Sequence, residues 1–188
     1  FMWRDHQIET ILVGYFNIIN LLMAAETLNA LRFDRTDIAR GLRLVKTVRG
    51  RMEPISIARC DVSFLVDYAH KPDALSEALK AARSITARKV WVVFGAGGNR
   101  DQRKRSVMGE IAAGLADEVV VTSDNPRSED PLVIANQIIV GTQRGKARSQ
   151  IILDRADAIH FAIGEAVAGD LILVAGKGHE TYQTMGDE

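Results

Sequence analysis

The sequence predicts an α/β fold in which a mainly parallel sheet has helices on both faces, preceded by a smaller helical region. From Ser63 onward, apolar runs of strand length alternate with segments whose apolar residues recur every three or four positions. Strands and helices in alternation build parallel sheets. The composition agrees, because 47% of the 188 residues are apolar, which is enough to bury a sizeable core.

Residues 1–49 carry two helical patterns and are expected to form a unit of their own. The segment Ile8–Val13 resembles the end of a strand. An Ala- and Leu-rich helix follows over residues 18–31, and a shorter helix over residues 34–44. Strand patterns begin only after these helices, so we place a second domain over residues 50–188.

Polar residues near the two helix starts suggest caps and one external contact. Asn17 is a natural N-cap for the first helix, and Thr36 or Asp37 for the second. Asn20 differs, because an amide inside the first turn of so apolar a helix gains little unless it bonds something outside. Two interpretations stay open: a solvated or backbone-bonded side chain, or an amide that hydrogen-bonds a purine.

The second domain is expected to begin with an antiparallel hairpin. Residues 51–58 and 63–67 are strand-like and flank a turn over residues 59–61. Cys60 is the one cysteine of the sequence, so it forms no internal disulfide, and we interpret it as a structural turn residue. A helix then starts at Pro72, whose fixed φ suits the first helical position.

The most informative stretch is a strand–helix–strand unit over residues 90–127. Val90–Phe94 is an apolar run of strand length, an amphipathic pattern covers residues 107–115, and Glu118–Thr122 is the next buried strand. The remaining elements are predicted as a helix over residues 131–140, a strand over 151–153, a helix over 155–167 and a strand over 170–175. This order implies that the strands after the hairpin are mainly parallel.

Gly95, Gly97 and Gly98 resemble the start of a dinucleotide-binding fingerprint. The third glycine of that fingerprint would fall at position 100, which is Arg100. A nicotinamide site needs a small residue there for close packing of helix against strand, so a nucleotide-dependent oxidoreductase is disfavoured. We expect instead that the glycines let the backbone turn sharply and aim Arg100 back over the strand end.

The charge balance bears on partners and location. The 24 basic and 24 acidic residues cancel, so no global field favours nucleic acid or a membrane surface. The sequence shows neither a signal-peptide pattern nor a membrane span, and we expect a cytoplasmic, monomeric protein. Zinc-ligand spacings are absent, and His6 and His160 are interpreted as ordinary surface residues.

Charged side chains gather where the predicted strands end. Arg100 follows one strand, Asp124 and Arg127 follow the next, and Glu180 follows the last. Parallel strands end at one edge of their sheet, where α/β folds bind ligands, so these side chains are expected to meet there. Two cations with two anions fit a zwitterion that has more than one charged end, whereas a phosphate site would lack the carboxylates.

Asp67 and His70 form a second polar group. They share the loop between a predicted strand and the following helix, a position where α/β folds build sites. Neither residue provides a metal site alone, so a ligand or catalytic contact is the functional interpretation of the pair.

Six motifs in a fixed order resemble those of the Mur ligases, the ATP-dependent amino-acid ligases of peptidoglycan synthesis. They are Gly14-x-Phe-Asn17-x-x-Asn20, Gly50-Arg-Met-Glu53, Asp67-Tyr-Ala-His-x-Pro-Asp73, Phe94-Gly-x-Gly-Gly, Asp124-Asn-Pro-Arg127 and Ala175-Gly-Lys-Gly-His-Glu180. The resemblance covers nearly the whole chain, and the combination is specific in a way that no single motif is. Small departures are Asn99, where an acid is common, and Lys71, where Thr is common.

The resemblance implies a three-domain enzyme of which this chain is the carboxyl-terminal part. Residues 1–49 would be the helical tail of the central ATPase domain. Residues 50–188 would be a Rossmann-like domain that brings in the amino acid, truncated at its end. The family's phosphate-binding loop, magnesium ligands and carbamylated lysine lie upstream, so the chain alone is expected to be inactive.

The resemblance also implies roles for single residues. ATP would be bound by Asn20, Arg51 and Asp67, with Asp67 and His70 near its ribose or phosphates as catalytic residues. The residues expected to hold meso-diaminopimelate are Arg100, Asp124, Asn125, Pro126, Arg127, Gly176 and Glu180. No metal ligand is assigned within the chain, since the Mg²⁺ that accompanies ATP would be held upstream.

The implied reaction joins meso-diaminopimelate to a UDP-N-acetylmuramoyl dipeptide. ATP would phosphorylate the side-chain carboxylate of D-glutamate, and the amino group of diaminopimelate would attack the acyl phosphate and displace phosphate. The residues named above would mainly position reactants, which is itself a large catalytic effect. An alternative stays open, namely a non-catalytic module that binds an amino acid or a nucleotide.

Overall fold

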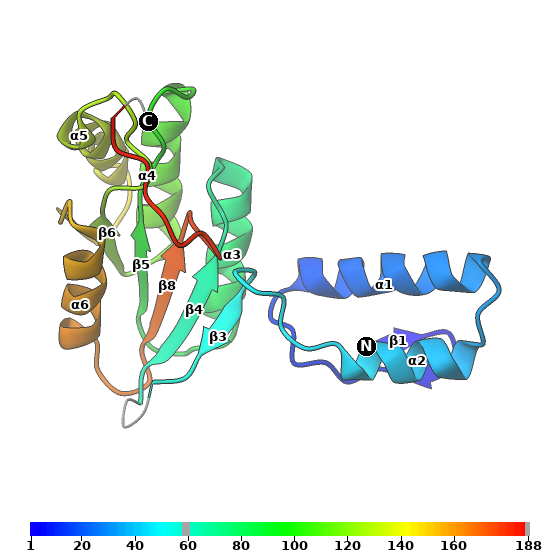
Figure 1. Cartoon of the computed structure of the whole chain (residues 1–188). Coiled ribbons are helices and arrows are strands. Elements are labelled where there is room, and N and C mark those ends of the chain that lie inside the picture. Colours follow the sequence, from blue (N-terminus) through cyan, green and yellow to red (C-terminus); the bar gives the residue numbers. More distant parts are fainter. Residues whose placement is uncertain (58–60, 187–188) are drawn as a thin grey trace. The chain divides into compact units, whose positions relative to one another are not determined.

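The computed structural model describes residues 1–57 and 61–186, which belong to two compact units (Figure 1). The first unit is Phe1–Val48 and the second is Arg49–Glu188. Within the described residues, no helix is both long enough and apolar enough to cross a membrane. Most of the turn predicted over residues 59–61, with Cys60, lies outside the described residues.

The first unit packs two helices against a short hairpin. β1 (Met2–Trp3) and β2 (His6–Gln7) pair antiparallel, and α1 (Tyr15–Ala30) and α2 (Arg35–Leu44) follow. Its core consists of Trp3, Ile8, Leu21, Ala25, Ile38, Ala39 and Leu42. The strand predicted over Ile8–Val13 is wrong, because this segment is neither strand nor helix. Only its first apolar residue is buried, so the segment lacks the repeating buried face that fixes a strand in a sheet.

The predicted caps of these helices are also wrong. Asn17 lies inside the first turn of α1, and its Nδ2 donates a hydrogen bond to the Val13 carbonyl oxygen at 2.7 Å. Asp34 caps α2, since its carboxylate accepts hydrogen bonds from the backbone N–H groups of Thr36 and Asp37. α1 begins at Tyr15, three residues before the predicted start, and α2 begins at Arg35, directly after its cap, so both caps lie upstream of the predicted ones.

The second unit is built on a six-stranded sheet with the strand order β3-β4-β8-β5-β6-β7. The strands are β3 (Glu53–Ile55), β4 (Ser63–Asp67), β5 (Val90–Phe94), β6 (Glu118–Val121), β7 (Arg148–Ile151) and β8 (Leu171–Ala175). β3 pairs antiparallel with β4, and every other pairing is parallel, so both the hairpin and the parallel sheet are confirmed. β7 begins three residues before the strand predicted over residues 151–153.

Helices cover both faces of this sheet, as predicted. They are α3 (Pro72–Ser84), α4 (Arg103–Leu115), α5 (Pro131–Thr142) and α6 (Arg155–Glu165). α3, α4 and α5 pack side by side on one face, and α6 packs on the other against Trp91 and Val93 of β5. All five residues of β5 are buried, because this central strand is covered from both sides.

The parallel register brings four strand ends to one edge of the sheet. Asp67 at the end of β4 lies opposite Ala175 at the end of β8, and Phe94 at the end of β5 lies opposite Val121 at the end of β6. β8 lies between β4 and β5, so loops that are far apart in the sequence become neighbours. This edge is where an open α/β sheet binds ligands.

Candidate binding pocket at the carboxyl edge of the sheet

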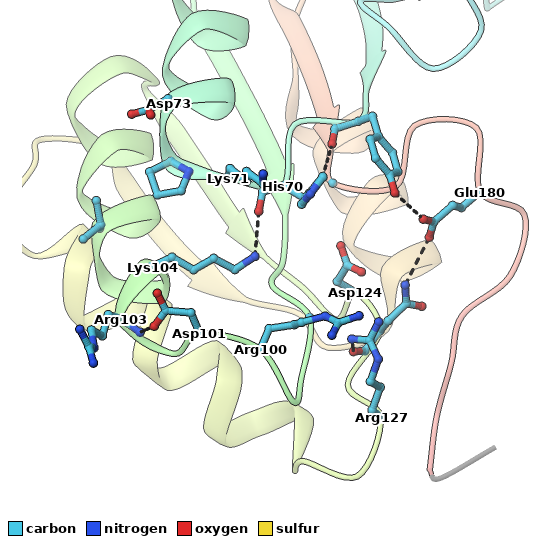
Figure 2. A pocket seen from close by; sticks show the side chains of 16 residues that line it. His70, Lys71, Asp73, Arg100, Asp101, Arg103, Lys104, Asp124, Arg127 and Glu180 are labelled. Atoms are coloured by element: carbon cyan, nitrogen blue, oxygen red, sulfur yellow. Dashed lines mark hydrogen bonds between the residues drawn. The ribbon is translucent and has the colours of Figure 1, made fainter.

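A pocket of about 750 Å³ lies between the loops that follow β4, β5, β6 and β8 (Figure 2). The residues predicted from the sequence that line it are His70, Arg100, Asp124, Asn125, Arg127, Gly176 and Glu180. Further charged residues of its wall are Lys71, Asp73, Asp101, Arg103 and Lys104. The predicted meeting of charged side chains at one edge is therefore confirmed, while their roles toward a ligand stay predictions.

Four other predicted residues are not among the described residues that line this pocket. Asp67 and Pro126 are buried. They are close in the sequence to residues of the pocket, but they do not line it. Arg51 is exposed, and its guanidinium carbon lies 4.9 Å from the centre of the Tyr68 ring. Asn20 is exposed on α1, in the first unit. The proposed contacts of Asn20, Arg51 and Asp67 with ATP, and of Pro126 with diaminopimelate, therefore rest on the family resemblance alone.

The glycine-rich loop after β5 is in close contact with the loop after β6. A Cβ on Gly95 would lie 2.1 Å from the Thr122 carbonyl oxygen, and one on Gly98 would lie 1.9 Å from the Pro126 carbonyl oxygen. The residue of this loop that adopts a positive φ is Asn99, at 53°. We predicted that these glycines allow a sharp turn, and this explanation is wrong. Glycine is needed at Gly95 and Gly98 because the backbones of the two loops are in contact there.

Asp124 presents a carboxylate that the described protein leaves unpaired. The residue is only 7% exposed, yet no side chain or backbone group of the described chain donates a hydrogen bond to it. Gly176, at φ 109°, lies beside it, and a Cβ there would come within 2.8 Å of the Asp124 Oδ2. The carboxylate lines the pocket and has no donor among the described residues, so Asp124 is suited to accept hydrogen bonds from an ammonium group of a ligand.

The two arginines of the pocket differ in how firmly they are held. Arg100 is exposed and extends toward Asp124, with no hydrogen bond to the described residues (Figure 2). Arg127 has a positive φ of 52°, and its Nη1 donates to the carbonyl oxygens of Gly98 at 2.8 Å and Asn125 at 3.3 Å. Its Nε and Nη2 remain available, and this edge of a guanidinium can hold a carboxylate through two hydrogen bonds.

Glu180 is held by three donors from three loops. Oε1 accepts from the Tyr68 hydroxyl at 3.1 Å, and Oε2 accepts from Asn125 Nδ2 at 3.2 Å and from Lys177 Nζ at 3.0 Å. Burial by itself would raise the pKa of Glu180, but the hydrogen bonds, with that of Lys177 the strongest, lower it below its ordinary value. Glu180 is therefore an anion at neutral pH, in a fixed orientation.

Asp67 joins three backbone segments instead of facing the pocket. Its Oδ2 accepts from the Met52 N–H and its Oδ1 from the Ala69 N–H, both at 2.8 Å, while its carbonyl oxygen accepts from Gly176 and Gly178. Burial raises the pKa of Asp67 above its ordinary value despite these hydrogen bonds. The structure gives Asp67 a role in organising loops, and its catalytic role stays a prediction.

His70 and Lys104 form the wall of the pocket at the start of α3 and α4. The His70 ring faces the Tyr68 carbonyl oxygen through Nδ1 at 2.9 Å, so Nδ1 carries the proton, since a carbonyl only accepts. Lys104 Nζ donates to the His70 carbonyl oxygen at 2.9 Å, and burial lowers the pKa of this amine. The His70 ring and the Lys104 amine, both hydrogen-bond donors, thus lie across the pocket from Asp124 (Figure 2).

Sequence reasoning missed Tyr68, Lys104 and Lys177. Lys177 and Tyr68 fall inside two of the quoted motifs. Lys177 contacts Glu180 within one loop, whereas the contact of Tyr68 with Glu180 depends on pairing between β4 and β8, which no local pattern reveals. Lys104 lies in a run of cations whose members look alike in the sequence. Within the described residues, no cluster of three or more His, Cys, Asp or Glu side chains could hold a metal ion.

Residues 50–178 match the family model described as "Mur ligase, glutamate ligase domain". The chain belongs to this family. A curated relative in Geobacillus thermodenitrificans (strain NG80-2), named UDP-N-acetylmuramoyl-L-alanyl-D-glutamate–2,6-diaminopimelate ligase, is 47% identical over 181 residues. The match covers 96% of this Mur ligase chain, which spans 37% of the length of that relative.

Solved structures give the same assignment of the fold. The structure of a protein with the same ligase name is 38% identical, has a TM-score of 0.68, and is matched over 96% of this chain and 37% of its own. A folylpolyglutamate synthase of Mycobacterium tuberculosis, solved with ADP and AMPPCP, has a TM-score of 0.70 over 90% of this chain and 39% of its own. At 23% identity, the latter supports the fold alone.

Proposed function

We propose that this Mur ligase domain binds meso-diaminopimelate for an ATP-dependent ligase that adds it to UDP-N-acetylmuramoyl-L-alanyl-D-glutamate. The observation that carries the proposal is the set of unpaired charges in the pocket. Asp124 lacks a donor, and Arg100 and the free edge of Arg127 lack acceptors among the described residues. A ligand with an ammonium flanked by carboxylates would satisfy all three groups.

The charge pattern favours diaminopimelate over a simple diamino acid such as lysine. Both amino acids carry the amine that reacts, but diaminopimelate has one further carboxylate beside its distal amine. In our proposal Asp124 accepts hydrogen bonds from that amine, and Arg127 donates to the carboxylate next to it. Glu180, an anion fixed by Tyr68 and Lys177, would bind an ammonium as well.

In the proposed reaction, the domain positions the nucleophile. ATP transfers its terminal phosphoryl group to the side-chain carboxylate of D-glutamate, giving an acyl phosphate and ADP. The neutral amine of diaminopimelate attacks the acyl carbon, the new C–N bond replaces the C–O bond to phosphate, and the amine loses one proton. The carboxyl edge of the sheet would hold the amine in line for this attack, and orientation alone is a large effect.

ATP and Mg²⁺ would be bound largely outside these residues. The described residues provide no cluster that fits a metal ion, so no step is assigned to Mg²⁺ here. We assign residues 1–49 to the tail of the central ATPase domain. Asn20 of this segment, with Arg51 and Asp67 of the second domain, would contact ATP, and Asp67 and His70 would lie near its ribose or phosphates. A reaction that uses ATP and a uridine nucleotide precursor would place the enzyme in the cytoplasm.

The proposal is tested with a complete ligase that carries this domain. Phosphate release and product mass are measured with ATP and the UDP-linked dipeptide, with meso-diaminopimelate or lysine as the amino acid. We expect a tripeptide product with diaminopimelate and little product with lysine. Saturable binding of diaminopimelate without any amide product would favour a non-catalytic binding module instead.

A further inference from the structure

Arg105 and Glu129 form an ion pair between the loops that carry Arg100 and Arg127. The Arg105 side chain, in the first turn of α4, is fully buried, and that of Glu129 is 21% exposed. The contact is bidentate, with Nη1 donating to Oε2 at 2.8 Å and Nη2 donating to Oε1 at 2.9 Å. Neither residue is among those that line the pocket.

The pair extends to both loops through the backbone. Arg105 Nη2 donates to the Gly97 carbonyl oxygen at 3.2 Å, and the Asn99 N–H donates to Glu129 Oε1. Gln137 of α5 accepts a further hydrogen bond from Arg105 Nη1 at 2.6 Å. One guanidinium and one carboxylate thus reinforce a junction of the two loops that also includes the hydrogen bond from the Gly98 N–H to the Asn125 carbonyl oxygen at 2.9 Å.

Stability alone does not explain a charged pair at this position. Arg105 donates to Glu129 and holds the pKa of that carboxyl below its ordinary value, so the pair is ionised. Yet Arg105 Nε is buried and has no partner among the described residues. Apolar side chains of similar volume often replace a buried ion pair without loss of stability, because they avoid the cost of removing charge from water.

What apolar side chains cannot supply is a directed link between two loops. Arg100 lies three residues after Gly97, and Arg127 lies two residues before Glu129, so the pair contacts both loops close to the two arginines of the pocket. A ligand that bridges both arginines is sensitive to the separation of their guanidinium groups, since its carboxylates are a fixed distance apart.

We propose that Arg105 and Glu129 are positioning residues that set the spacing of Arg100 and Arg127 and thereby select the amino acid that the pocket accepts. This inference rests on the proposed function and extends it to two residues that do not touch the ligand. In this proposal Arg100 and Arg127 bind the ligand, and Arg105 and Glu129 determine the positions of those two arginines.

The test replaces both partners at once in a complete ligase, as Arg105→Met with Glu129→Met. We expect a thermal midpoint near that of the wild type and an unchanged KM for ATP. The KM for meso-diaminopimelate should rise about 10- to 100-fold, because displacing groups that orient a reactant by about 1 Å has effects of this size. Discrimination against lysine should fall as well.

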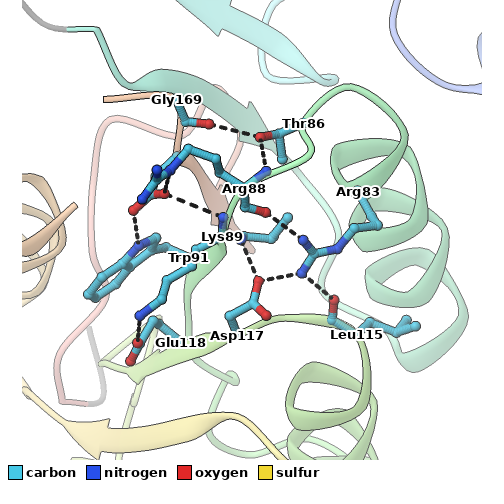
Figure 3. Close-up of polar contacts among 11 residues, drawn as sticks. Arg83, Thr86, Arg88, Lys89, Trp91, Leu115, Asp117, Glu118 and Gly169 are labelled. Carbon is cyan, nitrogen blue, oxygen red and sulfur yellow. Dashed lines mark hydrogen bonds and ion pairs between the residues drawn. The ribbon is translucent and has the colours of Figure 1, made fainter. Parts of the chain in front are cut away.

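A matched control removes an ion pair at the opposite edge of the sheet. Arg83→Met with Asp117→Asn breaks the pair between the end of α3 and the start of β6 (Figure 3). This variant should lose stability and keep the wild-type KM for diaminopimelate. If the Met pair fails to fold, Arg105→Gln with Glu129→Gln, which leaves no buried charge unpaired and retains some polar contact, serves instead with a smaller expected rise in KM.

The outcomes distinguish the two proposals. If the wild-type ligase does not use meso-diaminopimelate, the proposed function is wrong, and this inference falls with it. If the wild type uses it but the KM of each folded variant stays within about twofold, or the KM for ATP rises equally, Arg105 and Glu129 are not positioning residues. A selective rise in the KM for diaminopimelate supports the inference.

Discussion

Unpaired charge distinguishes the two edges of the parallel sheet, although the edge where the strands end also has ion pairs such as Lys177 with Glu180. At the edge where the strands begin, charged side chains are paired with one another (Figure 3). The pairs are Arg83 with Asp117, Arg88 with Asp170 and Lys89 with Glu118. At the edge where the strands end, Arg100 and Asp124 have no partner among the described residues (Figure 2).

This difference separates charges that serve the fold from charges that serve a ligand. Asp170 is 1% exposed and accepts hydrogen bonds from Val167, Arg88, Lys89 and Trp91. Asp124 is about as deeply buried, at 7%, but its carboxylate faces a pocket. The fold thus uses the carboxylate of Asp170, whereas the carboxylate of Asp124 can accept hydrogen bonds from a ligand in the pocket.

The largest expected effect is on stability, at the paired edge. Asp170→Ala should lower the free energy of unfolding by about 3–5 kcal/mol, because it leaves buried donors without an acceptor. Asp124→Ala should change it by about 1 kcal/mol or less, since no described group loses a partner. Urea unfolding at pH 7 measures both. Equal losses in the two variants would remove the distinction between the edges.

Substrate choice should depend on Arg127. Arg127→Ala in a complete ligase should reduce the preference for meso-diaminopimelate over lysine by roughly 2–4 kcal/mol, or about 30- to 1000-fold in kcat/KM. The reason is that lysine lacks the distal carboxylate that Arg127 would bind. Arg144→Ala, which removes an exposed arginine paired with Glu110, is the control and should change neither rate. A parallel fall for both amino acids would assign Arg127 to the fold.

A smaller effect is expected at Tyr68, whose uncharged hydroxyl donates a hydrogen bond to Glu180. Tyr68→Phe removes one of three donors to that carboxylate, so its pKa should rise toward the ordinary value. The KM for diaminopimelate should increase about 2- to 10-fold, corresponding to the loss of one hydrogen bond, with unchanged unfolding. An unchanged KM would show that Lys177 and Asn125 suffice to orient Glu180.

The smallest effects concern pH, and they have opposite signs at the two edges. Burial alone would raise the pKa of Asp170, but its hydrogen bonds lower it, so its stabilisation is present above about pH 4 and is lost as the pH falls through its folded-state pKa. Burial raises the pKa of Asp67, so this group favours folding less as the pH rises from about 4 through its folded-state pKa.

Asparagine variants test these signs by the slope of stability against pH. Asp170→Asn should flatten the acid-side loss, and Asp67→Asn should flatten the opposing trend, each by about 0.5–1 kcal/mol across the window. Unfolding midpoints between about pH 3 and 7 provide the slopes. Slopes of the same sign for both residues would contradict the assigned environments.

The sequence predicted those parts of the fold that have a local pattern. β5 and β8 are continuous apolar runs, and their boundaries agree with prediction within one residue. β7 was misplaced because it is an edge strand whose sequence, Arg148–Ile151, is mostly polar. The position of β8 between β4 and β5 had no local signal, since it depends on pairing between distant segments.

The pocket shows the same division. Residues at strand ends, such as Arg100 and Asp124, could be placed at one edge because parallel strands end together. The contacts among loops could not, because the hydrogen bonds from Tyr68 and Asn125 to Glu180 and from Arg105 to Glu129 join residues 24 to 112 positions apart. Asp67 was predicted to face a ligand, but its carboxylate is occupied by backbone N–H groups.

The most direct test of the account is calorimetric titration of meso-diaminopimelate into a complete ligase with Asp124→Asn. The amide keeps the size of the side chain and removes only the charge that would hold the distal ammonium. We predict that binding weakens about 10- to 100-fold, as expected for one charge-assisted hydrogen bond, while the urea midpoint stays that of the wild type. Unchanged affinity, or a loss of stability like that predicted for Asp170→Ala, would contradict the claim that the unpaired charges at the carboxyl edge serve to bind a ligand.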